Sequence, residues 1–464
     1  MSELLVRGGS VVTAEGTEIQ DILMRDGLIV RMGKNLETTG ETIEAAGHWV
    51  MPGGIDTHTH LAHPIGRLGV TTADDFYTGT VAGAFGGVTT ILDFGLQAQG
   101  GTLRDAREQR LSVIAPDAVI DYGFHLIVTD VNDEVLAEIP DLIASGFPSF
   151  KVYMTYGDKK IGDDDLIRLL EITGEHHGLI YAHCENDCAV THLIERHLAA
   201  GETGPSFHAT SRPPSVEAEA TNRAIMLAEV AGAPICIAHV TSSGAAEHVA
   251  SARARGAPVV AETCPQYLVL DESVYDPAAG CEVAKYVCSP PMREHSHVDA
   301  LWAALAARSI QQVSSDHAPF RFEGQKTAGC GNFTEIPNGL PGIETRLPIL
   351  FTAGVASGRL TPERFVELTA TGPADIFGLK DKGRIAVGAD ADLIVIDPDA
   401  EVEVTADALH SAVDYSPYEG MRLKGFPRWT VSRGEVIIAD GVLRGSRGRG
   451  RLAARRPIDP STLP

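Results

Sequence analysis

The sequence predicts an α/β protein with a (β/α)8 TIM barrel and a small β-sandwich domain formed by the N- and C-terminal segments. Three observations carry this prediction. Apolar strand-length runs alternate with amphipathic segments such as DDDLIRLLEITGEHHG through the middle of the chain, a pattern typical of parallel strands joined by crossover helices. Eight such strand candidates occur, which is the number in a (β/α)8 barrel. Short β-type runs separated by Gly, Asp and Asn turns occur at both ends of the chain.

The strand candidates place the predicted domains. In chain order they are GGIDTHTH, GVTTILDF, DYGFHLIV, SFKVYMTY, GLIYAHCE, PICIAHV, PVVAETCP and QVSSDHAP. We assign the barrel to residues 53–375. Residues 1–52 and 376–442 hold short strands that need a second layer to bury their apolar faces, so they are expected to pair into one sandwich. Residues 443–464 are rich in Arg, Gly and Pro and are expected to be a flexible tail or a subunit contact.

The composition disfavours several classes of protein. The 62 acidic and 38 basic residues give a formal charge of −24, which repels phosphate backbones, so no nucleic-acid partner is expected. The start of the chain lacks a signal-peptide pattern, and no run approaches the ~20 apolar residues of a membrane span. We therefore expect no membrane contact and a cytoplasmic location. The seven cysteines are scattered without a CxxC pair and are expected to be reduced thiols.

Polar residues at the ends of five predicted strands indicate a metal site. They lie on the first, fourth, fifth, sixth and eighth strands: His58, His60, Lys151, His183, His239 and Asp316. His58 and His60 point to the same side of a strand because strand side chains alternate. The catalytic groups of such barrels lie at the C-terminal ends of the strands. Buried polar groups without partners are costly, so the set favours a metal pair over satisfied core histidines.

Lys151 needs a separate explanation, since an ammonium among metal ions would repel them and is costly to bury. A buried lysine loses its proton readily. The neutral amine can react with carbon dioxide to give a carbamate, an anionic group with two oxygens that can bridge two cations. The alternative left open is a salt bridge between Lys151 and Asp316.

These residues and their surroundings resemble a known family. The order His-x-His, Lys, His, His, Asp resembles the binuclear branch of the amidohydrolase superfamily. The surrounding sequence, from about residue 45 to 440, resembles the dihydropyrimidinase/hydantoinase family of cyclic amidohydrolases. The segments that carry this resemblance are PGGIDTHTH, FGGVTTILDF, SFKVYMTY, AHVTSSGAAEHV, ETCPQYL, CSPPMR, SSDHAPF, GQK with IPNG downstream, and AVGADADLIVID.

The resemblance implies a set of metal ligands and their chemistry. Two zinc ions, or other divalent metals, would be bound, the first by His58, His60 and Asp316 and the second by His183 and His239. Lys151, converted by carbon dioxide to N6-carboxylysine, would bridge both. A hydroxide between the metals would be the nucleophile, and Asp316 would act as general base and then as general acid.

The resemblance also implies substrate contacts. Tyr156 would donate a hydrogen bond to the developing oxyanion, and the main chains at Ser289 and Asn338 would bind the ring imide. From the residues alone, Tyr156 could equally be a barrel-rim tyrosine, and Ser289 and Asn338 turn residues.

The implied substrate is a small cyclic amide, a 5,6-dihydropyrimidine or a hydantoin, opened to an N-carbamoyl amino acid. Dihydroorotase relatives carry an arginine where this chain has Ala62, which argues against dihydroorotate and against carboxylate-bearing substrates generally. An allantoinase-type hydrolase is the alternative, because the segment PGIETRLPIL resembles the allantoinases more than the commonest hydantoinase sequence. A non-catalytic scaffold is disfavoured because all six ligand positions are filled.

Two segments are expected to form lids over the site, residues 62–75 and 155–165. Within or beside them, Ile65, Leu68 and Tyr153 are the predicted contacts of the substituent at ring carbon five. The resemblance further implies a homotetramer or a homodimer.

Overall fold

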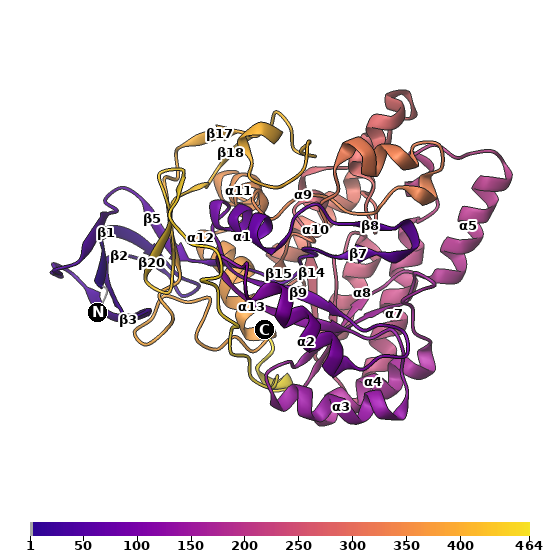
Figure 1. The fold of residues 1–464 in the computed structure, drawn as a ribbon, viewed down its shortest axis with the longest axis horizontal. Coiled ribbons are helices and arrows are strands. Elements are labelled where there is room, and N and C mark those ends of the chain that lie inside the picture. Colours follow the sequence, from indigo (N-terminus) through magenta and orange to yellow (C-terminus); the bar gives the residue numbers. More distant parts are fainter. Residues whose placement is uncertain (1–2) are drawn as a thin grey trace.

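The computed structural model describes residues 3–464 and consists of an α/β barrel and a separate sheet made from both ends of the chain (Figure 1). The predicted fold class is confirmed. The eight barrel strands fall on the eight predicted runs, and only β9 extends beyond its run, by two residues: β6 (Gly54–Asp56), β9 (Val88–Leu96), β10 (Asp121–Ile127), β11 (Ser149–Tyr153), β12 (Leu179–His183), β13 (Ile235–Ile237), β14 (Val259–Thr263) and β15 (Gln312–Val313). Each pairs in parallel with the next. A parallel bridge between Thr59 and His317 joins the first strand to the last.

Helices surround the barrel strands (Figure 1). The longer ones are α1 (Phe76–Phe85), α2 (Leu103–Ile114), α3 (Asp133–Ala144), α4 (Asp163–Glu175), α5 (Asp187–Ala199), α7 (Pro214–Ala231), α8 (Ser243–Ala254) and α10 (His295–Ala306). The short ones are α6 (Phe207–Thr210), α9 (Gln266–Val269), α11 (Arg346–Leu350), α12 (Pro362–Val366) and α13 (Gly372–Ile376). Helix α3 shows how the local sequence determines where such a helix begins and which face it buries. The Asn132 side chain caps its first turn by accepting from the Val135 amide, and its apolar stripe is buried against the barrel.

The separate sheet has nine strands. They are β1 (Glu3–Val12), β2 (Thr17–Arg25), β3 (Leu28–Gly33), β4 (Glu41–Glu44), β5 (Trp49–Pro52), β16 (Leu393–Ile396), β19 (Pro427–Ser432), β20 (Glu435–Ala439) and β21 (Val442–Leu443). Antiparallel pairing of β5 with β16 joins the two ends of the chain, with Val50 opposite Val395. Both side chains are buried in an apolar cluster that belongs to this sheet, as the predicted pairing of the two ends requires.

Two short ribbons lie outside these sheets. β7 (Pro64–Ile65) pairs with β8 (Val70–Thr71), and β17 (Glu401–Glu403) pairs with β18 (Arg422–Lys424). The first hairpin falls within the predicted lid at 62–75.

The C-terminal segment packs on its own barrel, where the sequence led us to expect a flexible tail or a subunit contact. The Ala453 amide donates to the Tyr122 carbonyl at 2.7 Å. The buried guanidinium of Arg455 donates to the carbonyls of Phe377 and Phe124, at 2.9 and 3.0 Å, and to the Ser149 hydroxyl at 2.6 Å. These contacts give a charged side chain several buried acceptors and thereby fix residues that look mobile by composition.

The cysteine prediction needs one correction. Cys281 and Cys330 form a disulfide, 49 residues apart in sequence, so the expectation of seven reduced thiols is wrong for these two. The other five are free. The pairing depends on the way two loops meet beside the barrel mouth, which sequence spacing does not reveal.

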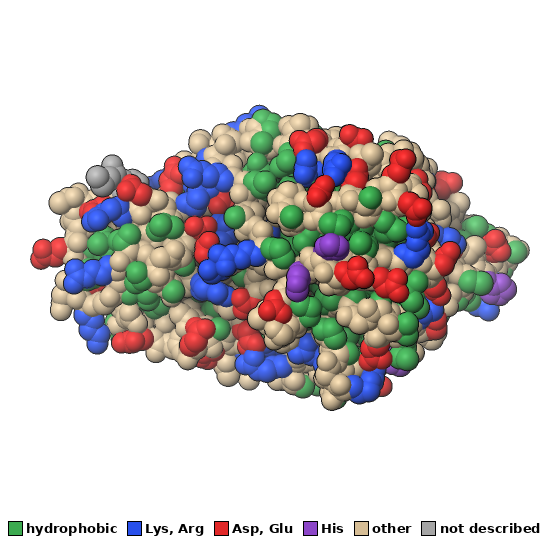
Figure 2. All heavy atoms as spheres, turned by 90° about the horizontal axis from the view of Figure 1, so that it is seen from below, with side chains coloured by type: hydrophobic (Ala, Val, Ile, Leu, Met, Phe, Trp, Pro, Cys, Tyr) green, Lys and Arg blue, Asp and Glu red, His purple; other side chains and the backbone are tan. Residues whose placement is uncertain are grey.

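Two observations describe the helices and the surface. No helix within residues 3–464 is long and apolar enough to cross a membrane. On the face drawn in Figure 2, acidic and basic side chains are interspersed with apolar ones.

Candidate active site

The C-terminal ends of the barrel strands open into one cavity of about 770 Å³, counted with the open space at its mouth. All nine predicted site residues line it: His58, His60, Lys151, Tyr156, His183, His239, Ser289, Asp316 and Asn338. Three of them, Tyr156, His239 and Asp316, have positive φ angles of 69°, 34° and 49°. Such backbone is unusual outside glycine and concentrates at functional sites.

His58, His60 and Asp316 form one compact group of donor atoms. Oδ1 of Asp316 lies 3.2 Å from Nε2 of His58 and 3.4 Å from Nε2 of His60, and one ligand atom from each of the three lies within 4.8 Å of the others. Burial lowers the pKa of His60 to about 3, which keeps its imidazole neutral, the form that binds a metal. Burial also raises the pKa of Asp316 to about 7. Neutral imidazoles beside a carboxylate fit a divalent cation.

His183 and His239 lie edge to face beside this group, with ring centres 4.5 Å apart. The Nδ1 atoms of His60 and His239 are buried without a hydrogen-bond partner among the described residues. Such orphaned atoms are rare in folded proteins unless an ion or water satisfies them. The donor set therefore fits a second metal position as well.

Lys151 is fully buried, and its Nζ has no hydrogen-bond partner within residues 3–464. The nitrogen lies 4.3 Å from the centre of the Tyr181 ring. Burial lowers the pKa of Lys151, although Glu262 and Asp316 act in the opposite direction. The described residues show no ion pair between Lys151 and Asp316, so the salt-bridge alternative has no contact to support it.

Glu262, at a buried position of β14, orients His58 and was missed by the sequence reasoning. Nδ1 of His58 donates to Oε1 of Glu262 at 2.8 Å. The same carboxylate accepts from the His239 amide at 3.0 Å and from the Tyr181 hydroxyl. The bond from Nδ1 to Glu262 fixes the His58 tautomer, so that Nε2, on the side of Asp316, carries the lone pair that a metal could use. The available signal was a glutamate inside the apolar run PVVAETCP.

Glu185 orients His183 in the same way. Nε2 of His183 donates to Oε2 of Glu185 at 2.7 Å, which leaves the lone pair of Nδ1 free to bind a metal. Nη1 of Arg212 donates to the same oxygen at 2.6 Å. Burial alone would raise the pKa of Glu185, but Arg212, with His183, holds it at about 2. The Arg212 guanidinium also lies 5.4 Å from the ring of Tyr156.

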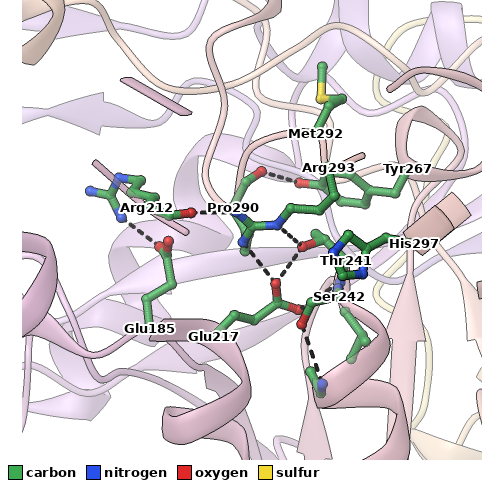
Figure 3. A network of polar contacts seen from close by, with 12 residues as sticks. Glu185, Arg212, Glu217, Thr241, Ser242, Tyr267, Pro290, Met292, Arg293 and His297 are labelled. Atoms are coloured by element: carbon green, nitrogen blue, oxygen red, sulfur yellow. Dashed lines mark hydrogen bonds and ion pairs between the residues drawn. The ribbon is translucent and has the colours of Figure 1, made fainter. Parts of the chain in front are cut away.

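Arg293 ties three active-site loops together (Figure 3). It donates to Oε2 of Glu217 at 2.9 Å, to the Thr241 hydroxyl at 2.8 Å and to the Arg212 carbonyl. Glu217 in turn accepts from the Thr241 amide at 2.7 Å. Because Thr241 follows His239 by two residues, this network links the CSPPMR segment to the loop that carries a metal-site histidine.

The predicted ring-binding residues lie side by side. Nδ2 of Asn338 donates to Oγ of Ser289 at 3.0 Å. Behind them, the fully buried Nζ of Lys326 donates to the carbonyls of Val287 and Pro337 at 2.9 and 3.2 Å. Lys326, the last residue of GQK, thus joins the two segments that present Ser289 and Asn338, a role the sequence did not disclose.

The predicted lids also reach the cavity. Ile65 and Tyr153 line it, as do Arg67 and Lys159, whereas Leu68 is not among the lining residues. Ala62 is half-buried with φ of 45°.

Comparison with known proteins places these features in a family. The chain matches the Amidohydrolase family over residues 49–437. It is 46% identical over 455 residues to a D-hydantoinase of Geobacillus stearothermophilus, covering 97% of this chain and 96% of the relative. It is 42% identical over 465 residues to a D-phenylhydantoinase of Escherichia coli, covering 99% and 100%. The solved structure of a dihydropyrimidinase from Brevibacillus agri superimposes with a TM-score of 0.96 at 42% identity, covering 98% of this chain and 99% of that one.

Proposed function

The chain belongs to the amidohydrolase family as a cyclic-amide hydrolase of the dihydropyrimidinase/hydantoinase type, and from that premise we propose that it opens hydantoins or 5,6-dihydropyrimidines to N-carbamoyl amino acids. The observation that carries the proposal is the single cavity in which the metal-type donors meet Tyr156 and the Ser289–Asn338 pair. This hydrolysis needs metal-binding donors and ring-binding residues in the same cavity.

We propose that two zinc ions, or other divalent metals, are the cofactor. His58, His60 and Asp316 would hold one, His183 and His239 the other, and Lys151, carboxylated by carbon dioxide, would contact both. When bound, such a pair polarises the scissile carbonyl and makes water acidic enough to attack at neutral pH. The neutral buried imidazoles and the unpartnered Lys151 amine support this assignment.

Asp316 would carry the proton. It takes a proton from the attacking water as the new C–O bond forms, and it delivers that proton to the ring nitrogen as the C–N bond breaks. Burial of Asp316 favours its protonated form, which helps it to take up the proton before it passes the proton on. Water is thereby added across the amide bond with no other reactant.

Tyr156 would stabilise the charge that develops on the carbonyl oxygen. Burial raises the pKa of its hydroxyl, despite the opposing charge of Arg212, so it stays protonated and can donate. The main chains at Ser289 and Asn338 would bind the ring imide and hold the scissile bond against Asp316.

The test is a ring-opening assay of metal-loaded enzyme on dihydrouracil, hydantoin, 5-substituted hydantoins, allantoin and dihydroorotate. We expect N-carbamoyl products from the hydantoins or dihydrouracil and none from dihydroorotate. Asp316→Asn should lower kcat at least ~100-fold, the lower range for general acid–base catalysis. Turnover of allantoin without any hydantoin would replace this proposal with the allantoinase alternative.

We also propose that the protein is located in the cytoplasm and forms a homotetramer or a homodimer. The family likeness and exposed apolar side chains support the proposed assembly. Met226 and Val230, one turn apart on α7, are 47% and 72% exposed. Light scattering on the purified protein would measure the subunit number, and a monomer would contradict this part of the proposal.

A further inference from the structure

The outer wall of the active-site cavity carries two cationic side chains that the proposed mechanism does not use. Arg67 comes from the β7–β8 hairpin, and Lys159 comes from the loop between β11 and α4. Both line the cavity together with Ile65 and Tyr153, which are predicted to contact the substituent at ring carbon five of the substrate. Arg67 and Lys159 therefore lie in the part of the cavity where the exocyclic substituent of the substrate is expected.

Lys159 is directed toward the cavity and lacks a counter-ion. It is half-buried and has no ion pair or side-chain hydrogen bond within residues 3–464. Its Nζ lies 5.7 Å from the centre of the Tyr153 ring. Burial is the main cause of the low pKa values of His60 and His63, and the charge of Lys159 contributes to both. The ammonium is thus close enough to act on the metal-site end of the cavity.

The charge balance at the mouth is positive. Asp158 also lines the cavity and raises the pKa of Lys159, but burial and Arg67 outweigh it, so that this pKa is lowered. Two cations therefore face one nearby carboxylate. Arg67 is further held by a hydrogen bond from Nη1 to the Thr334 carbonyl at 2.7 Å. A half-buried ammonium without a partner is unfavourable, and an anionic ligand would relieve that cost.

Lys160, the next residue, provides a contrast. Its Nζ forms an ion pair with Asp187, and it does not line the cavity. The neighbouring lysine therefore has a structural partner, whereas Lys159 has none, although both lie in the same loop.

We propose that Lys159, assisted by Arg67, forms a cationic subsite for a carboxylate on the substituent at ring carbon five of the substrate. This inference rests on the proposed function and narrows it to hydantoins whose side chain is acidic, so that the product is the N-carbamoyl derivative of an acidic amino acid. It revises the sequence argument from Ala62. The missing arginine there removes one cation near the second metal histidine, but two others enter the cavity from different loops.

The test compares two substrates of the same shape, hydantoin-5-acetic acid and its neutral amide, on the zinc-loaded enzyme. One partly exposed charge-assisted hydrogen bond predicts a kcat/KM about tenfold higher for the acid, mainly through KM. In Lys159→Met the ratio of acid to amide should fall to about one. In the matched control Lys160→Met it should stay at the wild-type value.

The outcomes separate this inference from the proposed function. If the wild-type enzyme opens unsubstituted hydantoin but does not prefer the acid, the subsite is wrong and the hydrolase assignment stands. An unchanged ratio in Lys159→Met, with turnover intact, would equally overturn it. Failure to open any hydantoin or dihydropyrimidine would instead remove the proposed function, and the inference with it.

Discussion

Replacing Arg212 by methionine should measure how strongly one buried cation holds the side chains behind the metal-site histidines. Arg212 is 5% exposed, and Nη1 lies 2.6 Å from Oε2 of Glu185. Methionine approximates the volume of the stem and leaves the carbonyl that accepts from Arg293. The fully buried Glu185 would then keep the hydrogen bond from His183 and the weaker influence of the Arg293 charge. Removing one member of a buried ion pair costs about 3–5 kcal/mol.

The pKa of Glu185 gives a second route to this magnitude. Burial raises that pKa, yet Arg212 and His183 bring it from 4.5 to about 2. A difference of 2.5 units corresponds to about 3 kcal/mol. Because the folded-state pKa is the lower one, this stability is present above pH 4.5 and is lost as the pH falls toward 2. At ~2.1 cal/mol/K per residue, the unfolding entropy of this chain is ~1 kcal/mol/K, so the melting temperature should fall by about 3 °C.

The assay is the melting temperature of the zinc-loaded protein at a fixed scan rate, at pH 7 and pH 5. In Arg212→Met the unopposed burial raises the pKa of Glu185, so the carboxylate gains a proton and the loss should shrink at pH 5. The double variant with Glu185→Gln should recover more than half of the loss. Arg223→Met is the control, because that residue pairs with Glu219 at the surface and should change little. A loss below 1 °C, or one independent of pH and of Glu185, would refute the reasoning.

Three further predictions concern the same cavity. Lys151→Ala should lose metal and activity, and short-chain acids should restore part of both; a variant that keeps two metals and full activity without added acid would exclude the carbamate. Glu262→Gln should weaken zinc affinity ~10- to 100-fold in a chelator competition, because His58 loses its orienting carboxylate; unchanged affinity would contradict that role. Burial lowers the pKa of Lys326 to about 7, below its unfolded value of 10.5. Wild-type stability should therefore rise between pH 7 and 10.5, a slope that Lys326→Met should reduce, and a wild-type melting temperature that is flat over this range would contradict it. The same variant should raise KM for hydantoin, since the loops that present Ser289 and Asn338 lose a shared donor, and an unchanged KM would remove that role.

The strand-borne part of the site could be predicted from the sequence because strands obey a simple rule. Side chains alternate along a strand, and the C-terminal ends of parallel barrel strands meet at one mouth. Those two facts brought His58 and His60 together with Lys151 and Asp316, which lie about one hundred to more than two hundred and fifty residues further along the chain. The same reasoning gave all eight barrel strands, since each is an apolar run of strand length bounded by polar or glycine-rich sequence.

The side chains that hold these residues in place could not be predicted from the sequence. Their contacts join pairs of residues in different loops, and no periodic pattern in the sequence marks such pairs. Glu185 and Arg212 lie 27 residues apart, and their contact depends on how the loop after β12 folds back. Arg293 reaches Glu217 across 76 residues. Lys326 looks like an ordinary loop lysine until its two carbonyl partners are known. The Cys281–Cys330 disulfide belongs to the same class of loop contacts.

The pairing of charges among these side chains explains how the site can be rigid and still bind cations. Glu185 has a buried counter-ion of its own in Arg212, so its charge is satisfied by the protein and its pKa stays at about 2. Burial instead raises the pKa values of Asp316 and Glu262 to about 7. One of these carboxylates is a proposed metal ligand, and the other holds the imidazole of His58. A divalent cation favours their ionised forms, so binding should release protons near neutral pH and add to the folding free energy. Arg212 thus keeps Glu185 ionised without any metal, whereas the ionised forms of Asp316 and Glu262 would depend on the proposed metal ions.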